Sequence, residues 1–140
     1  VNVIDCFNGI IVNSGSNIYL KNCLVCSNSN TLLCTTGISL KDCTYVKCIN
    51  CSSNSNTSHG STCHGFSVQD SSLITLQNCT AHTNIGNQKT VGFYLKNIEK
   101  HSFVSYCSAQ ANSSIEDDAH GFLLENCKNP NSKIIDGLWC

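Results

Sequence analysis

"NCTAHTN", residues 78–84, is one of four similar seven-residue stretches in this 140-residue chain, and the spacing of the four decides the fold. The others are "NCLVCSN" (22–28), "NCSSNSN" (50–56) and "YCSAQAN" (106–112). The second residue of each is a cysteine, the last is an asparagine, and successive copies are separated by one constant interval. Residue types that keep one interval over four copies indicate tandem structural repeats. The two columns are Cys23, Cys51, Cys79 and Cys107, and Asn28, Asn56, Asn84 and Asn112.

A glycine opens another part of each repeat and is followed by alternating apolar residues, as in "GISL" (37–40) and "GFSV" (65–68). Residues two apart in a strand point to the same face, so the second and fourth positions of these segments should face a core. A polar turn, a second alternating segment and a short third segment follow in each copy. The repeats are expected to start near Gly9, Gly37, Gly65, Gly92 and Gly121.

This pattern predicts a parallel β-solenoid with two or three short strands per repeat and no amphipathic helix. One coil cannot bury its own apolar face, but stacked coils place equivalent strands about 4.8 Å apart and share a continuous core. Leucine-rich repeats need a leucine spacing that these copies lack, and the two-residue alternation excludes helical repeats. We expect about five coils of about 28 residues each. Together they would form a single segment over residues 1–140 that is part of a longer chain.

The frame Gly-[Ile/Phe]-x-[Val/Leu], then Ile-x-Leu-x-Asn-Cys, then x-Ala-x-x-Asn resembles the repeat of pectate-lyase-like proteins. The resemblance covers essentially the whole chain, from about Val3 to Leu138, and matches no specific enzyme family. It implies an all-β, right-handed parallel β-helix. It leaves the function open, because lyases, hydrolases, epimerases and surface proteins share this fold.

Both repeated columns are expected to be structural ladders, in which equivalent residues stack on successive coils. A free cysteine packs as a small apolar residue, and an asparagine amide can bond the equivalent turn of the next coil. A zinc site at Cys48, Cys51, Cys63 and His64 is disfavoured because Cys48 belongs to an inward column. We expect no metal and no cofactor. Other cysteines could pair or stay free, and Cys6, Cys34 and Cys63 would form a further column.

Two groups of acidic residues are candidate sites. Asp42 and Asp70 occupy equivalent turns one coil apart, which would bring two carboxylates together as in glycosidases, although both are as easily turn caps. The stretch "EDDAH" would bind a divalent cation or act on a sugar, but a solvated loop is the favoured interpretation. Its candidate binding residues are Glu116, Asp117, Asp118 and His120.

The chain departs from the enzymes that it resembles. Polysaccharide lyases of this fold generally use a basic residue, often arginine, and polygalacturonase-like hydrolases use an acid triad with an Arg-x-Lys element; this chain has no arginine. We therefore expect a non-catalytic segment that serves as a stalk, an adhesin or a glycan-contacting surface. The alternative is a fragment of a carbohydrate-active enzyme, either a polysaccharide lyase or a glycoside hydrolase, acting on polysaccharide.

The composition limits the possible partners. The formal net charge of -1 gives no basic field for nucleic acid, and no apolar run is long enough to span a membrane. The expected partners are a polysaccharide or cell-surface glycan, together with flanking coils or domains. We expect an extracellular or cell-surface location by analogy of fold, while a cytoplasmic one stays open if all the cysteines are free.

Overall fold

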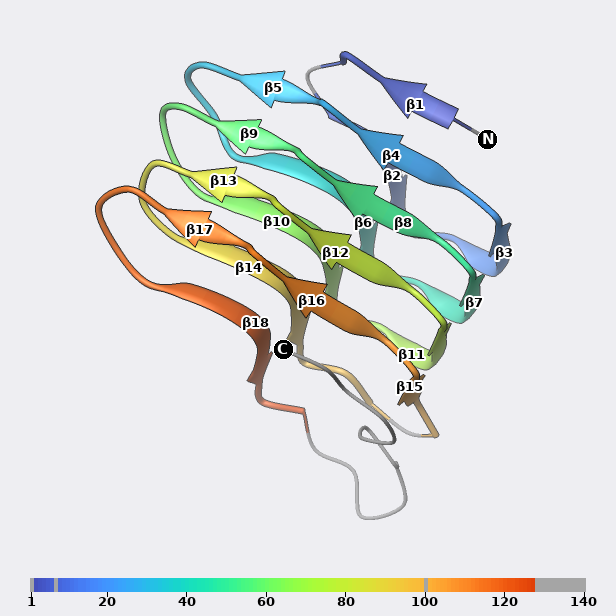
Figure 1. The fold of residues 1–140 in the computed structure, drawn as a ribbon. Coiled ribbons are helices and arrows are strands. Elements are labelled where there is room, and N and C mark those ends of the chain that lie inside the picture. Colours follow the sequence, from blue (N-terminus) through green and yellow to red (C-terminus); the bar gives the residue numbers. More distant parts are fainter. Residues whose placement is uncertain (1, 7, 100, 128–140) are drawn as a thin grey trace.

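The chain folds as a parallel β-solenoid. The computed structural model describes residues 2–6, 8–99 and 101–127, in which all regular structure is β-strand and every strand pair is parallel. Figure 1 shows the coils stacked along one axis, with β1 at one end of the stack and β18 towards the other. Each complete coil contributes one strand to each of four sheets, here called A to D.

The two sheets with the longest strands form the first half of each coil. Sheet B contains β2 (Ile10–Asn13), β6 (Thr35–Lys41), β10 (Cys63–Gln69), β14 (Thr90–Lys96) and β18 (Ala119–Glu125). Sheet C contains β3 (Ser16–Lys21), β7 (Thr44–Ile49), β11 (Ser72–Gln77) and β15 (Phe103–Ser105).

Shorter strands complete each coil. Sheet A contains β1 (Asn2–Ile4), β4 (Leu24–Cys26), β8 (Ser52–Asn54), β12 (Thr80–His82) and β16 (Ser108–Gln110). Sheet D contains the two-residue strands β5 (Ser29–Asn30), β9 (Thr57–Ser58), β13 (Ile85–Gly86) and β17 (Ser113–Ser114).

The register confirms the period of the repeat and corrects the number of coils. Thr80 pairs with Ser52 on one side and with Ser108 on the other, each of them one period away in the sequence. The described residues contain four complete coils, β2 to β17, with β1 and β18 belonging to further turns, rather than about five coils. The end of the predicted repeat at Leu138 lies outside the described residues.

The first step of the solenoid is shorter than the others. Val3 pairs with Val25, and Val25 pairs with Ser53 on its other side. Fewer residues separate the first pair in the sequence than separate the second pair. Cys6 therefore lies at the end of the asparagine column, where its backbone N–H donates to Oδ1 of Asn28 at 2.9 Å. Because Cys63 pairs with Thr35, the predicted column of Cys6, Cys34 and Cys63 does not form.

The core consists of columns of like residues, as the repeat predicts. Phe66, Phe93 and Phe122 stack with ring centroids 4.8 and 4.9 Å apart. The cysteine ladder is also part of this core. The backbone N–H group that follows a ladder cysteine donates to the carbonyl of the ladder cysteine on the preceding coil, which is Cys23, Cys51 or Cys79. The side chains of Cys23, Cys51, Cys79 and Cys107 are at most 4 % exposed.

The asparagine ladder lies at the corner between sheets A and D. The Nδ2 group of each asparagine donates to Oδ1 of the next, at 2.9, 2.8 and 2.9 Å along the column. The first three side chains are completely buried. The column thus satisfies its amide groups inside the solenoid. Its members are Asn28, Asn56, Asn84 and Asn112.

The turns between sheets B and C explain the polar residues that follow the first strand of each repeat. The residue at this corner has a positive φ of 49–55° in every coil, a conformation that asparagine and aspartate tolerate better than most residues. The first four turns also donate a backbone hydrogen bond to the next coil, as from Asp42 N to the carbonyl of Gln69. The column contains Ser14, Asp42, Asp70, Asn97 and Asn126.

Candidate functional site

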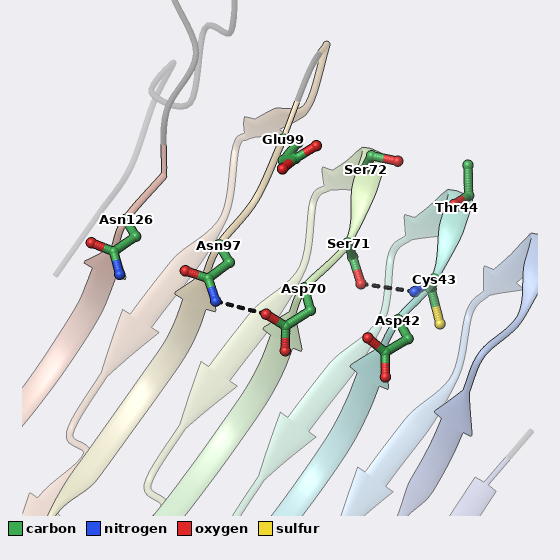
Figure 2. A pocket seen from close by; sticks show the side chains of 9 residues that line it. All are labelled: Asp42, Cys43, Thr44, Asp70, Ser71, Ser72, Asn97, Glu99 and Asn126. Atoms are coloured by element: carbon green, nitrogen blue, oxygen red, sulfur yellow. Dashed lines mark hydrogen bonds between the residues drawn. The ribbon is translucent and has the colours of Figure 1, made fainter.

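A groove of about 730 Å³ runs along the corner between sheets B and C. Figure 2 shows that the turn residues line it in a file, one from each successive coil, where the strands of sheet B end. The lining is polar and contains three acidic residues and no basic one. The lining residues are Asp42, Cys43, Thr44, Asp70, Ser71, Ser72, Asn97, Glu99 and Asn126.

One wall of the groove is formed by the turns themselves. Their positive φ directs the backbone around the corner and leaves short side chains projecting from it. Nδ2 of Asn97 donates to Oδ1 of Asp70 on the neighbouring coil at 2.6 Å (Figure 2). Asp42 and Asp70 are both exposed. The wall therefore presents carboxylates and amides at intervals of one coil.

Hydroxyl groups and a third carboxylate form the opposite wall. Ser72 pairs with Thr44 and forms a parallel bridge with Glu99, so these three residues are equivalent positions of successive coils. Between the walls lie Cys43 and Ser71, both buried. The Ser71 hydroxyl accepts from Cys43 N at 3.0 Å and donates to the carbonyl of Gln69 at 2.6 Å. These two hydrogen bonds hold the floor of the groove in place.

The structure brings the two predicted acids, Asp42 and Asp70, into the same groove, and their role remains a prediction. Sequence reasoning missed Glu99, whose column is otherwise hydroxylic. A signal for it was present: Gly92 follows Gly65 one position sooner than the period of the repeat predicts. The same shortened interval, counted from Ser72, leads to Glu99.

The "EDDAH" segment has a different environment. Glu116, Asp117 and Asp118 are exposed in the loop between β17 and β18, while His120 is half-buried on β18 opposite Val91. Across residues 2–6, 8–99 and 101–127, no three His, Cys, Asp or Glu side chains are placed to hold a metal ion. None of these four residues lines the groove.

Exposed aromatic side chains lie on the outer face of sheet C, next to the groove. Tyr45 directly follows Thr44 of the groove lining and is 59 % exposed. Tyr19 is 57 % exposed, and it pairs with Lys47, two residues beyond Tyr45. Phe103 lies in the same row of sheet C and is 44 % exposed. These rings were not among the predicted site residues, although the sequence places aromatic residues at outward strand positions.

Comparison of this chain with protein-family models, with curated proteins and with solved structures finds no match. Among the described residues, no helix is long and apolar enough to cross a membrane.

Proposed function

We propose that this chain is a non-catalytic β-solenoid segment of a secreted or cell-surface protein that contacts glycans through the groove between sheets B and C. The observation that carries the proposal is the juxtaposition of this polar groove with exposed aromatic rings. Carboxylates, amides and hydroxyls can hydrogen-bond sugar hydroxyls, and an exposed tyrosine offers an apolar face with a polar tip. The resemblance to pectate-lyase-like repeats favours the same ligand class and an exported protein.

The charge of the groove limits the classes of glycan that can bind there. Asp42, Asp70 and Glu99 are its charged lining residues, and all three are acidic. Like charges repel across a partly desolvated interface. The preferred glycan is therefore neutral or carries amino groups, and polyuronates such as pectate are disfavoured.

Binding of the full chain to an array of neutral, amino and acidic oligosaccharides tests the proposal. Binding to a neutral or amino glycan is expected to weaken at least about tenfold in Asp70→Asn, because the groove loses a charge-assisted acceptor. Asp5→Asn is the matched control, since Asp5 also has a positive φ and lies outside this groove. Equal binding by the two variants, or selective binding of polyuronates, would contradict the assignment of the groove.

The second candidate is a carbohydrate-active enzyme, favoured by the position of Asp42 and Asp70 on neighbouring turns of one groove. Paired carboxylates act on glycosidic bonds when one is a proton donor and the other is a base or nucleophile. Release of sugar from a bound glycan, abolished by Asp42→Asn or Asp70→Asn, would replace the non-catalytic proposal with this one. Binding without sugar release supports the first.

A further inference from the structure

A second cluster of reactive side chains lies on the outer face of sheet B. Sγ of Cys34, just before β6, lies 3.7 Å from Nδ1 of His64 on β10. The imidazole stacks on the ring of Tyr94 on β14, with centroids 5.0 Å apart and an interplanar angle of 13°. The Tyr94 hydroxyl donates to Oε2 of Glu125 on β18 at 2.9 Å. A thiol, an imidazole, a phenol and a carboxylate thus follow one another across four neighbouring strands.

This arrangement contains the parts of an activated nucleophile. Such a site needs a thiol or hydroxyl within hydrogen-bond reach of a base, and a further group that orients the base. His64 is within reach of the Cys34 sulfur, and Tyr94, itself held by Glu125, fixes the plane of the imidazole. The Thr36 hydroxyl lies 3.7 Å from the same sulfur, and the Cys34 thiol also lies 3.8 Å from the backbone carbonyl of Thr35.

The surroundings keep the imidazole neutral, so that it can accept a proton. Burial lowers the pKa of His64 to about 4, and the positive charge of Lys89 acts in the same direction, so His64 is a weaker base than a free histidine. Burial also raises the pKa of Tyr94 to about 12, so its ring is neutral. Glu125 bonds the Tyr94 hydroxyl and pairs with Lys96, the charge of Asp70 also acts on Tyr94, and the thiol of Cys63 lies near Cys34.

We propose that Cys34 and His64 form a covalent modification site that takes small-molecule disulfides. The Cys34 thiol gives its proton to Nδ1 of His64 as the sulfur attacks one sulfur of the disulfide. A new S–S bond forms to Cys34 while the S–S bond of the reagent breaks. The leaving thiolate takes the proton from His64 and departs as a free thiol. Cys34 is oxidised to a mixed disulfide, and the leaving sulfur of the reagent is reduced to a thiol.

The other thiols provide comparisons within the same molecule. Cys26 and Cys127 are half-buried like Cys34. Cys127 donates to the backbone carbonyls of Leu95 and Glu125. Cys6 is more exposed and donates to the carbonyl of Ile4. Accessibility alone therefore predicts that Cys6 reacts first and that the three half-buried thiols react at similar rates, whereas assistance by His64 singles out Cys34.

The first test uses the unmodified full chain and 2,2′-dithiodipyridine at neutral pH, with modified peptides quantified by mass spectrometry over time. Cys34 is expected to react at least about tenfold faster than Cys26 and Cys127, less than the roughly hundredfold minimum usual for a general base, because the lowered pKa of His64 makes it a weak one. Similar rates for all three thiols would overturn the proposal. This comparison requires no variant.

The second test is His64→Asn, which keeps a polar group near the position of Nδ1 but removes the base. The Cys34 rate is expected to fall about tenfold, while the Cys127 rate stays the same. Protection of the buried Cys51 shows in the same experiment that the fold is intact. An unchanged Cys34 rate in a variant that still protects Cys51 would overturn the role of His64; a variant that exposes Cys51 leaves the decision to the first test.

Discussion

At the scale of single residues, buried amides hold the coils together. The Asn56 side chain makes four hydrogen bonds: its Nδ2 donates to Asn84 Oδ1 and Ser53 Oγ, and its Oδ1 accepts from the N–H and the Nδ2 of Asn28. No buried side-chain nitrogen or oxygen among the described residues lacks a partner. A buried group that loses its partner costs about 1–3 kcal/mol. The ladder is therefore sensitive to the loss of any inner member.

Asn56→Ala is expected to lower the free energy of unfolding by about 2–5 kcal/mol, because it leaves the Asn28 amide and backbone N–H without acceptors. Urea denaturation followed by circular dichroism measures the loss. Asn50→Gly is the control: Asn50 is exposed, its φ of 53° suits glycine, and it donates one 3.3 Å bond to Asn22. We expect the control to lose less than about 1 kcal/mol. Equal losses would show that burial of the ladder is not what stabilises the stack.

At the scale of strands, a glycine in sheet B allows sheet A to approach closely. A Cβ on Gly65 would lie 2.6 Å from Cβ of Ala81 and 2.7 Å from the carbonyl oxygen of Gly92. The strand begins two residues before this glycine, at Cys63, and Gly65 and Phe66 both face the core. The alternation of inward-facing and outward-facing residues along β10 therefore breaks at Gly65, because two consecutive residues face the core. The repeated glycine thus sets the distance between two sheets as well as opening a repeat.

Gly65→Ala is expected to destabilise the protein by about 1–3 kcal/mol, because the extra methyl group overpacks a close contact between two sheets. Thermal or urea denaturation measures the effect. Adding Ala81→Gly removes one of the two close contacts, so the double variant should recover part of the loss. A double variant whose loss equals the sum of the single losses would mean that the two residues do not interact.

The sequence predicted those elements that the repeat carries. The inward columns, the B–C turns and both ladders follow from residue types at a fixed period, because the same environment recurs in every coil. The strands of sheet D were not predicted, since two polar or small residues, as in β9 (Thr57–Ser58), show no alternation. The groove was predicted only at Asp42 and Asp70. The contact between Cys34 and His64 was missed because the two residues are not equivalent positions of the repeat.

At the scale of the whole molecule, the solenoid separates structural columns from surface chemistry. Residues that recur with the period of the repeat build the core and the corners, and Asp42 and Asp70 of the groove belong to the recurring corner column. Glu99, the exposed rings of sheet C and the Cys34–His64 pair depart from the repeat. Burial raises the pKa of the Cys63 thiol to about 12 and raises that of Cys48 further. These thiols are thus poor nucleophiles as well as inaccessible. The thiols of the stacked core should be inert in the native state because they are buried.

Alkylation of the full chain by iodoacetamide, resolved by peptide mass spectrometry, tests the stacked core most directly. Cys48, Cys51 and Cys79 have no exposed surface and are free thiols, whereas Cys6 is exposed. The stacked solenoid predicts that Cys6 is alkylated in the native state, that the three core thiols are not, and that all four are alkylated in denaturant without a reductant. Native alkylation of the core thiols as fast as that of Cys6, or core thiols that need a reductant after denaturation, would contradict it.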